Sequence, residues 1–308
     1  MGKNMKVVLL AANDWTNLGG QCAKSLREIG VDATMFIKKT HSFEYPNQGK
    51  IFKASSQVLP YIKKADVVLF MHSQYIDTGV DLKNKKVLVW HTGSRYRKYS
   101  KNVNKFFNPI VNASICGRDV FGLGAKNEKW VGGLVDVEAL NPVYKTGNDK
   151  IVLAHYPRGR HKGTGTIKNS IDEINKKGLL NGFIYKFSDK IVDWKSNIER
   201  VSKCDVYIED MGKGKNKSVF GIAALEAAAL GKIVITRFLF LEEYEKKFGK
   251  YGLQVANTQE ELVQKLIYLI SLSEKDLLKL KKRARKWVVR RHSYEAVAKR
   301  LLKVFNEV

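Results

Sequence analysis

The 308-residue chain has few cysteines, few prolines and no long hydrophobic run. Its three cysteines, Cys22, Cys116 and Cys204, form no CxxC pair, which excludes a disulfide framework and favours a reducing, cytoplasmic compartment. With 5 prolines, 24 glycines and 44% hydrophobic residues, the chain is not disordered, collagen-like or of low complexity. Its longest apolar runs, such as residues 7–12, are far shorter than the roughly 20 residues that span a bilayer. We therefore expect a folded globular protein with no membrane-spanning segment.

Acidic residues are also scarce, because 30 Asp and Glu stand against 55 Lys and Arg, a formal net charge of +25. Such an excess indicates anionic partners, for example a nucleic acid or a membrane surface. The sequence has no P-loop and no GxGxxG after the first strand, which argues against kinases and dehydrogenases. It has no HExxH motif and no paired histidines, so we expect no metal site. No pair of carboxylates flanks a candidate sugar site, which argues against glycoside hydrolysis.

Short apolar runs alternate with helical periodicity along the chain, which is typical of parallel strands buried on both faces. We expect strands at residues 7–12, 33–37, 67–71, 87–90, 151–155, 183–187, 206–208 and 232–236, with helices at 20–29 and 166–177 and another that ends at Leu230. A polar stretch at residues 145–150 separates the two series. The pattern predicts an α/β protein of two Rossmann-like doubly wound domains with a cleft between them, residues 1–145 and 146–290. A final helix in residues 291–308 is expected to pack back on the first domain.

The last third of the chain is expected to be helical. Thr258 and Glu261 form a capping box, and Ser273 is a second N-cap. After Ser273, an apolar stripe formed by residues 277, 280, 284, 287 and 288 is surrounded by seven cations: Lys279, Lys281, Lys282, Arg283, Arg285, Lys286 and Arg290. This basic helix is a candidate for contact with an anionic membrane surface.

The most informative segment is residues 218–236. Ser218 is a natural N-cap, Gly221 lets the backbone approach a ligand, and Gly231 is typical of a helix end. The N-terminus of such a helix binds anions such as a diphosphate. Glu226 is the only charge in this helix, about two turns in, where it would accept hydrogen bonds from sugar or ribose hydroxyls. The alternative is an Ala-rich core helix with a solvent-facing glutamate.

A second cluster of charge follows the expected strand at 151–155. Arg158, Arg160 and Lys162 place three cations within five residues. An arginine offers a planar fork and a lysine a point charge, so the cluster is suited to hold a diphosphate. The alternative is a solvated basic loop.

Several of these segments resemble motifs of the retaining, nucleotide-sugar-dependent GT-B glycosyltransferases of the family 4 type. The matching segments, in chain order, are Gly19-Gly20, residues 130–136 with Asn141-Pro142, residues 158–164, residues 219–221, residues 225–227 and residues 230–234. The resemblance thus covers nearly the whole chain. The sequence departs from the family at Ser218, where the family has an acid that contacts the donor sugar.

The resemblance implies a GT-B fold and transfer of a sugar from a nucleoside-diphosphate sugar, a UDP-sugar, with retention and with no metal or other cofactor. It assigns catalysis to His91, Arg158, Lys162 and Glu226, and donor binding to Gly19, Gly20, Arg160, Ser218, Phe220 and Gly221. His91 follows the strand at 87–90 and would stabilise charge near the anomeric carbon. The alternative for His91 is a packed or capping residue, and His72 is a weaker candidate.

Arg95, Arg97 and Lys98 follow His91 and interleave with tyrosines, a pattern suited to phosphate contacts and stacking on a polyanionic acceptor. Two acceptors remain open, a hydroxymethylated or otherwise modified DNA base, as in phage-type DNA glycosyltransferases, and a membrane-linked glycan. The protein is then expected in the cytoplasm, on DNA or at the membrane, without a stable protein partner. Further alternatives are a non-catalytic nucleic-acid-binding protein, a nucleotide-sugar epimerase, and lysines that are simply solvated.

Overall fold

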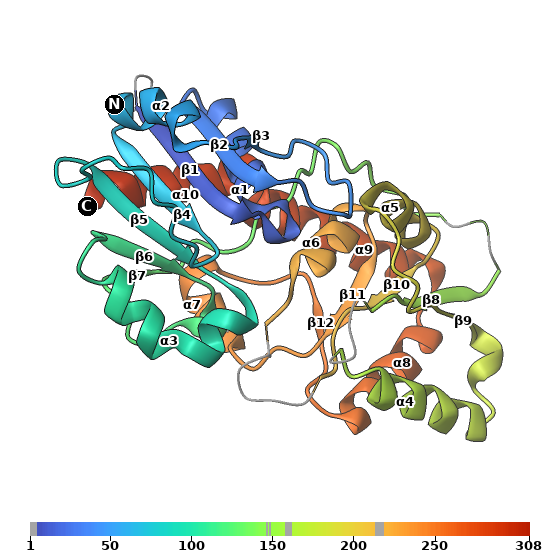
Figure 1. Ribbon diagram of the computed structural model, residues 1–308. Helices are drawn as coiled ribbons and strands as arrows, with labels where there is room; N and C mark the ends of the chain where they lie inside the picture. Colours follow the sequence, from blue (N-terminus) through green and yellow to red (C-terminus); the bar gives the residue numbers. More distant parts are fainter. Residues whose placement is uncertain (1–4, 146, 148, 158–161, 213–218) are drawn as a thin grey trace. The chain divides into compact units, whose positions relative to one another are not determined.

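The computed structural model describes the chain except for residues 1–4, 146, 148, 158–161 and 213–218 (Figure 1). The chain forms two compact units. Unit 1 comprises residues 1–134 and 294–308, and unit 2 comprises residues 135–293. The sequence-based boundaries were placed at 145 and 290. Residues 135–145 belong instead to unit 2, where Pro142 and Tyr144 pack against Gly231.

Unit 1 contains a seven-stranded parallel sheet in the order β3-β2-β1-β4-β5-β6-β7. Its strands are β1 (Lys6–Asn13), β2 (Asp32–Lys39), β3 (Lys50–Ile51), β4 (Val67–Met71), β5 (Lys86–His91), β6 (Ala113–Cys116) and β7 (Glu128–Lys129). Short 3-10 turns lie at η1 (Trp15–Asn17), η2 (Ser55–Gln57) and η3 (Arg118–Val120). The order reverses between β1 and β4, and in sheets of this kind ligands bind at the carboxyl ends of the strands beside that switch point.

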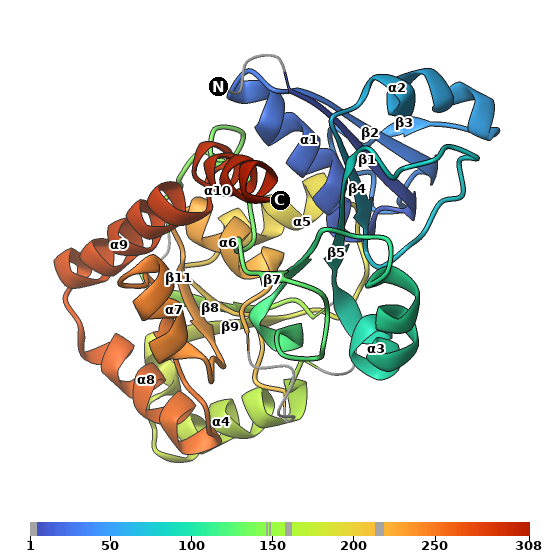
Figure 2. The same cartoon turned by 90° about the vertical axis from the view of Figure 1, so that its left-hand side faces the viewer.

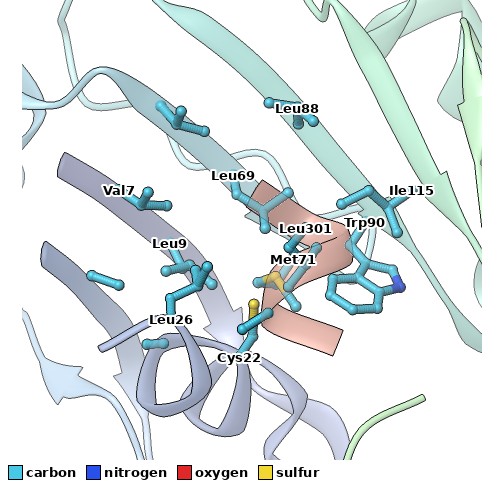
Figure 3. Close-up of a cluster of buried hydrophobic side chains, with 14 of the residues drawn as sticks. Val7, Leu9, Cys22, Leu26, Leu69, Met71, Leu88, Trp90, Ile115 and Leu301 are labelled. Atoms are coloured by element: carbon cyan, nitrogen blue, oxygen red, sulfur yellow. The ribbon is translucent and has the colours of Figure 1, made fainter. Parts of the chain in front are cut away.

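Successive residues of each strand point to opposite faces of this sheet, and different helices cover the two faces. On one face Leu9 and Leu69 pack with α1 (Leu18–Glu28) and with α10 (Tyr294–Glu307), and Figure 3 shows Leu301 of α10 in that cluster. On the other face Leu10 and Phe70 pack with α2 (Leu59–Lys64) and α3 (Gly93–Phe107). Helix α10 thus completes the core of a unit whose other elements all precede residue 135.

Unit 2 contains a five-stranded parallel sheet in the order β12-β11-β10-β8-β9. Its strands are β8 (Ile151–His155), β9 (Phe183–Phe187), β10 (Val206–Ile208), β11 (Ile233–Thr236) and β12 (Gln254–Val255). Its helices are α4 (Thr164–Lys176), α5 (Trp194–Ser202), α6 (Ile222–Ala229), α7 (Leu241–Phe248), α8 (Gln259–Ser271) and α9 (Glu274–His292), with a 3-10 turn η4 (Leu180–Gly182). The switch point of this sheet lies between β8 and β10.

Helices α4 and α8 pack together on one face of this sheet, and α6 packs against α9 and α5 on the other (Figure 2).

Two predicted N-caps are confirmed, because the Thr258 hydroxyl accepts from the Glu261 amide and the Ser273 hydroxyl from the Asp276 amide. The predicted α/β fold with two doubly wound sheets is also confirmed. None of the described helices combines the length and apolar composition needed to cross a membrane.

Candidate functional site

Charged side chains gather at the switch point of the unit 2 sheet. Lys162 follows β8, and its Nζ lies 2.7 Å from Glu209 Oε1 and 2.9 Å from Asp210 Oδ2, two residues that follow β10. Glu209 is buried and also accepts a hydrogen bond from the Thr236 hydroxyl at 3.0 Å. Burial would lower the pKa of Lys162, but attraction to the two carboxylates outweighs this effect and raises the pKa above its usual value. Lys162 is therefore a permanent cation at this site.

Two glycines let the backbone close around this cluster. Gly163 is the N-cap of α4 with a φ of 68°, and a Cβ there would lie 2.2 Å from the carbonyl carbon of Met211. Gly221 is the N-cap of α6, and a Cβ there would lie 2.9 Å from Glu209 Oε1. Glu209 therefore touches both Lys162 and the N-terminus of α6, two features that the sequence analysis had assigned to one site.

Among the described residues of this cluster, the predicted cation Lys162 is paired with acidic side chains. One lysine faces two carboxylates, so the three groups together carry a net negative charge. An ammonium group has three donors, and among the described residues Lys162 uses two of them for Glu209 and Asp210. Arg158, Arg160 and Ser218, which were predicted to serve the same site, lie outside the described residues.

Glu226 is buried, so the alternative of a solvent-facing glutamate is wrong. Its Oε1 accepts a hydrogen bond of 2.7 Å from the indole N–H of Trp194, at the start of α5. Helix α6 begins at Ile222, later than predicted, which places Glu226 about one turn from the helix start instead of two.

Phe220 packs inside unit 2. Its ring makes edge-to-face contacts with four aromatic side chains at centroid distances between 5.2 and 5.6 Å: Phe238, Tyr244, Trp287 and His292. These contacts hold the segment before α6 against α7 and α9. The side chain thus positions the helix N-terminus, and donor binding by the Phe220 ring itself stays a prediction.

His155, the last residue of β8, is a buried group that the sequence analysis missed. Its Nδ1 donates to the carbonyl of Ile208 at 2.8 Å, and its Nε2 accepts from the Thr164 hydroxyl at 3.0 Å. Burial lowers the pKa of His155. The ring ties β8 and β10 to the start of α4, beside Lys162. Its position at the end of an apolar strand and just before a basic loop was the available signal.

In unit 1, His91 lies fully buried at the end of β5. Its Nδ1 lies 2.8 Å from the Ser73 hydroxyl, and its ring stacks on Tyr96 at a centroid distance of 4.0 Å. Burial lowers the pKa of His91 to about 3, so the ring is neutral at physiological pH. This environment matches the packed alternative, and a catalytic contact by His91 stays a prediction.

The side chains at the unit 1 switch point are instead Asp14 and His72, which follow β1 and β4. Asp14 Oδ1 lies 2.8 Å from His72 Nε2, and His72 Nδ1 lies 2.7 Å from the Thr92 hydroxyl. The Asp14 carboxylate also accepts the amide N–H groups of Gly19 and Gly20, each at 2.8 Å. Gly19 and Gly20 were predicted to bind the donor, and a donor phosphate at their amides would have to displace the carboxylate. Asp14, which directly follows an apolar strand, was missed by the sequence analysis.

The predicted acceptor residues lie on α3. Arg97 is ion-paired with Asp119, and Arg95 and Lys98 are exposed. Arg95 lines a hollow of about 620 Å³ together with the exposed rings of Tyr75, Tyr99 and Phe106. Helix α3 carries five cations and no acid: Arg95, Arg97, Lys98, Lys101 and Lys105. Unit 1 therefore presents aromatic rings beside positive charge.

Of the seven cations beside the apolar stripe of α9, two contact groups inside unit 2, and five are exposed: Lys279, Lys282, Arg283, Lys286 and Arg290. Lys281 is buried, and its Nζ contacts Asp205 Oδ1 at 2.5 Å and the Tyr144 carbonyl at 2.6 Å. Arg285 donates to the carbonyls of Leu140, Ala229 and Val137. Two of its cations thus hold unit 2 together.

Within the part of the chain that the structure describes, no group of three or more His, Cys, Asp and Glu side chains is arranged to hold a metal ion.

No protein-family model and no curated protein sequence matches this chain. Solved structures do match it over nearly its whole length. A glycosyltransferase from Rickettsia africae has 14% identity and a TM-score of 0.67, with 98% of each chain covered. HepE from Anabaena in complex with UDP and glucose has 12% identity and a TM-score of 0.65, with 99% of this chain and 100% of HepE covered. An alpha-glucosyltransferase in complex with UDP and a 13-mer DNA containing a HMU base has 12% identity and a TM-score of 0.67, with 98% and 100% covered.

This chain has the GT-B fold. The matched proteins are GT-B glycosyltransferases, so the resemblance seen in the motifs extends to the complete fold. Within that fold, the described candidate groups are the Lys162 cluster at the switch point of unit 2 and the Asp14–His72 cluster at the switch point of unit 1.

Proposed function

We propose that the protein is a glycosyltransferase that moves a sugar from a UDP-sugar to a hydroxyl on an anionic acceptor. The observation that carries this proposal is the match of the whole fold to UDP-sugar glycosyltransferases, combined with a cation and a helix N-terminus that meet at Glu209 in unit 2. In this proposal Arg158, Lys162 and the amides that open α6 neutralise the diphosphate as the glycosidic bond breaks. Transfer proceeds with retention and without a metal ion.

Glu226 is proposed to accept hydrogen bonds from hydroxyls of the donor. Glu226 is buried, and the hydrogen bond that its Oε1 accepts from Trp194 holds the carboxylate in place at the first turns of α6. Replacement by alanine is expected to abolish turnover in a sugar transferase. A non-catalytic nucleic-acid-binding protein would be unaffected by the same change. Glu199→Gln on α5 is the matched control, because Glu199 is an exposed carboxylate paired with Lys203.

The donor is tested by thermal unfolding with a panel of nucleoside-diphosphate sugars. A ligand at 100 times its Kd stabilises the folded state by about 2.7 kcal/mol, which is readily measured. We expect a UDP-sugar to give the largest stabilisation, with transfer unaffected by a chelator. No stabilisation by any nucleotide sugar would refute the proposal. Product formation without any acceptor would instead identify a nucleotide-sugar epimerase.

For the acceptor, we propose a modified base in DNA. The support is the hollow on unit 1, where exposed aromatic rings lie beside Arg95 and the other cations of α3, since rings stack on bases and cations contact phosphates. One matched glycosyltransferase is itself in complex with DNA. A membrane-linked glycan is the second candidate, because α9 keeps five exposed cations although Lys281 and Arg285 are used inside unit 2.

DNA binding is tested by titrating duplex DNA at several salt concentrations. If α3 contacts the backbone, the affinity should fall steeply with salt, by about 0.9 log units per tenfold increase for each phosphate contacted. Arg95→Ala should weaken binding and flatten this slope. Lys83→Ala, an exposed lysine of unit 1 outside α3, should change neither. No binding at low salt would exclude DNA as the acceptor and leave the membrane-linked glycan.

A further inference from the structure

Arg237 is the first residue after β11, at the carboxyl edge of the unit 2 sheet. Strand β10 lies between β8 and β11, so the segment that follows β10 contacts the loops on both sides. On one side the Met211 amide donates to the Lys162 carbonyl at 3.0 Å. On the other side the Arg237 amide donates to the Asp210 carbonyl at 2.8 Å. Two cations therefore flank one short segment, residues 209–212, beside the switch point of this sheet.

The guanidinium group of Arg237 has more donors than partners. Its Nη1 donates to the Gly212 carbonyl at 2.7 Å. Its Nε is buried and makes no hydrogen bond within the part of the chain that the structure describes. Its Nη2 is accessible and likewise has no partner among the described residues. No described carboxylate forms an ion pair with Arg237, in contrast to Lys162, which faces two.

The two nitrogens without partners lie on one edge of the planar guanidinium group. The N–H of Nε and one N–H of Nη2 point in the same direction, a spacing that matches two oxygens of a phosphate or a carboxylate. A buried charged donor without an acceptor is unfavourable, and folded proteins rarely contain one. The bond from Nη1 to Gly212 fixes the side chain but leaves this edge unused. The edge is therefore suited to an anionic ligand that offers two oxygens.

The charges of the described residues at this edge also require Arg237 if an anion is to bind. Lys162 with Glu209 and Asp210 forms a group of net negative charge, which would repel a diphosphate or a carboxylate. Arg237 adds the positive charge that makes the described group neutral.

The residue after Arg237 connects it to the start of α6. Phe238 is 1% exposed, and its amide donates to Asn257 Oδ1 at 3.0 Å. Its ring packs edge-to-face on Phe220 at a centroid distance of 5.2 Å, and Phe220 directly precedes Gly221, the N-cap of α6. The backbone that carries Arg237 is therefore held on one side by the segment after β10 and on the other by the segment that opens α6.

We propose that Arg237 binds an anionic group of the sugar donor through the edge formed by Nε and Nη2. This inference rests on the proposed glycosyltransferase function and adds a donor-binding residue to it. The group recognised is a pair of anionic oxygens. Every UDP-sugar carries such oxygens on its diphosphate, and a UDP-linked uronic acid carries them on its sugar as well. Binding supplies the acceptor that Nε lacks, while the bond from Nη1 to Gly212 keeps the edge in place.

Isothermal titration calorimetry with uridine, UDP, UDP-glucose and UDP-glucuronate tests this assignment. Arg237→Gln is expected to weaken the binding of UDP by about 10- to 100-fold, because it removes hydrogen bonds to a charged group. Uridine has no phosphate, so its affinity should change by less than about twofold. Arg237→Lys keeps the charge but lacks the paired donors, and its affinity for UDP should lie between those of the wild type and the glutamine variant. Lys246→Gln, which removes an exposed cation from α7, should match the wild type with every ligand.

The same ligands identify the anionic group. If Arg237 binds the diphosphate, UDP, UDP-glucose and UDP-glucuronate lose affinity by the same factor in Arg237→Gln. If it binds a sugar carboxylate, UDP and UDP-glucose keep their affinity and only UDP-glucuronate loses it. Arg237→Lys provides the same comparison if the glutamine variant does not fold, since it keeps a cation at this position.

Two outcomes would overturn the assignment of Arg237. One is a variant that binds all four ligands as tightly as the wild type. The other is a variant that loses affinity for uridine and for UDP by the same factor, which would show that Arg237 only supports the fold. In both cases the wild type still binds UDP-sugars, so the proposed function stands. A wild-type protein that binds none of the three UDP ligands refutes the proposed function itself.

Discussion

Two glycines of α4 lie two residues apart but have different surroundings. Gly163 has a positive φ, and a Cβ there would collide with the backbone of Met211 and Gly212. Gly165 has open space around the position of a Cβ. Only Gly163 therefore holds the loop that carries Lys162 against the end of β10, where the Met211 amide also donates to the Lys162 carbonyl.

We predict that Gly163→Ala destabilises the protein by at least about 1–3 kcal/mol, because strain and a backbone collision act together. Gly165→Ala is the control, and it should be neutral or stabilise by up to about 1 kcal/mol, since alanine is the better helix former. Urea unfolding of both variants measures the difference. Equal stabilities of the two variants would contradict this description of the loop.

The burial of His91 leads to a separate prediction, about how the free energy of unfolding depends on pH. In the folded protein burial lowers the pKa of His91 from 6.5 to about 3, so between these values the unfolded chain binds a proton that the folded chain does not. The free energy of unfolding must therefore fall as the pH falls through this window, by up to about 1.4 kcal/mol per pH unit from this group. His91→Gln lacks this contribution. Urea titrations from pH 7 to pH 4.5 should give a shallower loss for the variant, and parallel curves would show that His91 is not buried as a neutral ring.

At the scale of elements, α9 illustrates how a charge pattern can mislead. Its apolar stripe faces the interior as predicted, with Ala284, Trp287 and Val288 buried. Two of the cations beside the stripe also point inward. Lys281 reaches Asp205, whose other oxygen accepts the Val152 amide at the start of β8. The helix is therefore tied to the sheet by a buried ion pair.

We predict that Lys281→Met destabilises the protein by about 3–5 kcal/mol, because the change leaves the Asp205 carboxylate buried without its cation. Lys282→Met, at the next and exposed position, should change stability by less than about 0.5 kcal/mol. Thermal unfolding of the two variants provides the comparison. A Lys281→Met protein as stable as the wild type would show that the pair contributes nothing net.

At the scale of the whole molecule, the chain leaves unit 1 at residue 134 and returns to it at residue 294. The two connections run side by side, since Val135 and Ser293 form a parallel bridge and the Val135 amide donates to the His292 carbonyl. After them, α10 packs against α1, and the Lys86 ammonium donates to the Phe305 carbonyl. The stability of unit 1 therefore depends on the last residues of the sequence.

We predict that Leu301→Ala, at a fully buried residue of α10, lowers the stability of unit 1 by about 2–5 kcal/mol. Hydrogen exchange measured by mass spectrometry should show faster exchange in β1 and β4, more than 200 residues earlier, and unchanged exchange in β8 and β10. Lys303→Ala, an exposed change in the same helix, should alter neither. Faster exchange in unit 2 alone would contradict the assignment of α10 to unit 1.

Much of the fold could be predicted from the sequence because its strands and helix starts depend on local patterns. The strands at 67–71, 151–155, 183–187 and 206–208 were predicted with the bounds that the structure has. The caps at Thr258 and Ser273 are equally local, since each hydroxyl bonds an amide three residues away. Apolar periodicity and capping chemistry act over a few residues and leave a readable signal.

What the tertiary structure alone decided is which side chains meet. The sequence indicates Lys162 as one of a group of cations, and only the fold shows that the ends of β8 and β10 place two carboxylates beside it. The sequence likewise indicates Lys281 as a surface charge, and only the packing of α9 shows that it pairs with Asp205. Among the histidines, the sequence favoured His91 over His72, but His91 is fully buried and the pairing of β1 with β4 places His72 beside Asp14. The sequence determined the strands, the helices and the excess of positive charge. Contacts between residues tens of positions apart depend on strand order, and no local pattern encodes that order.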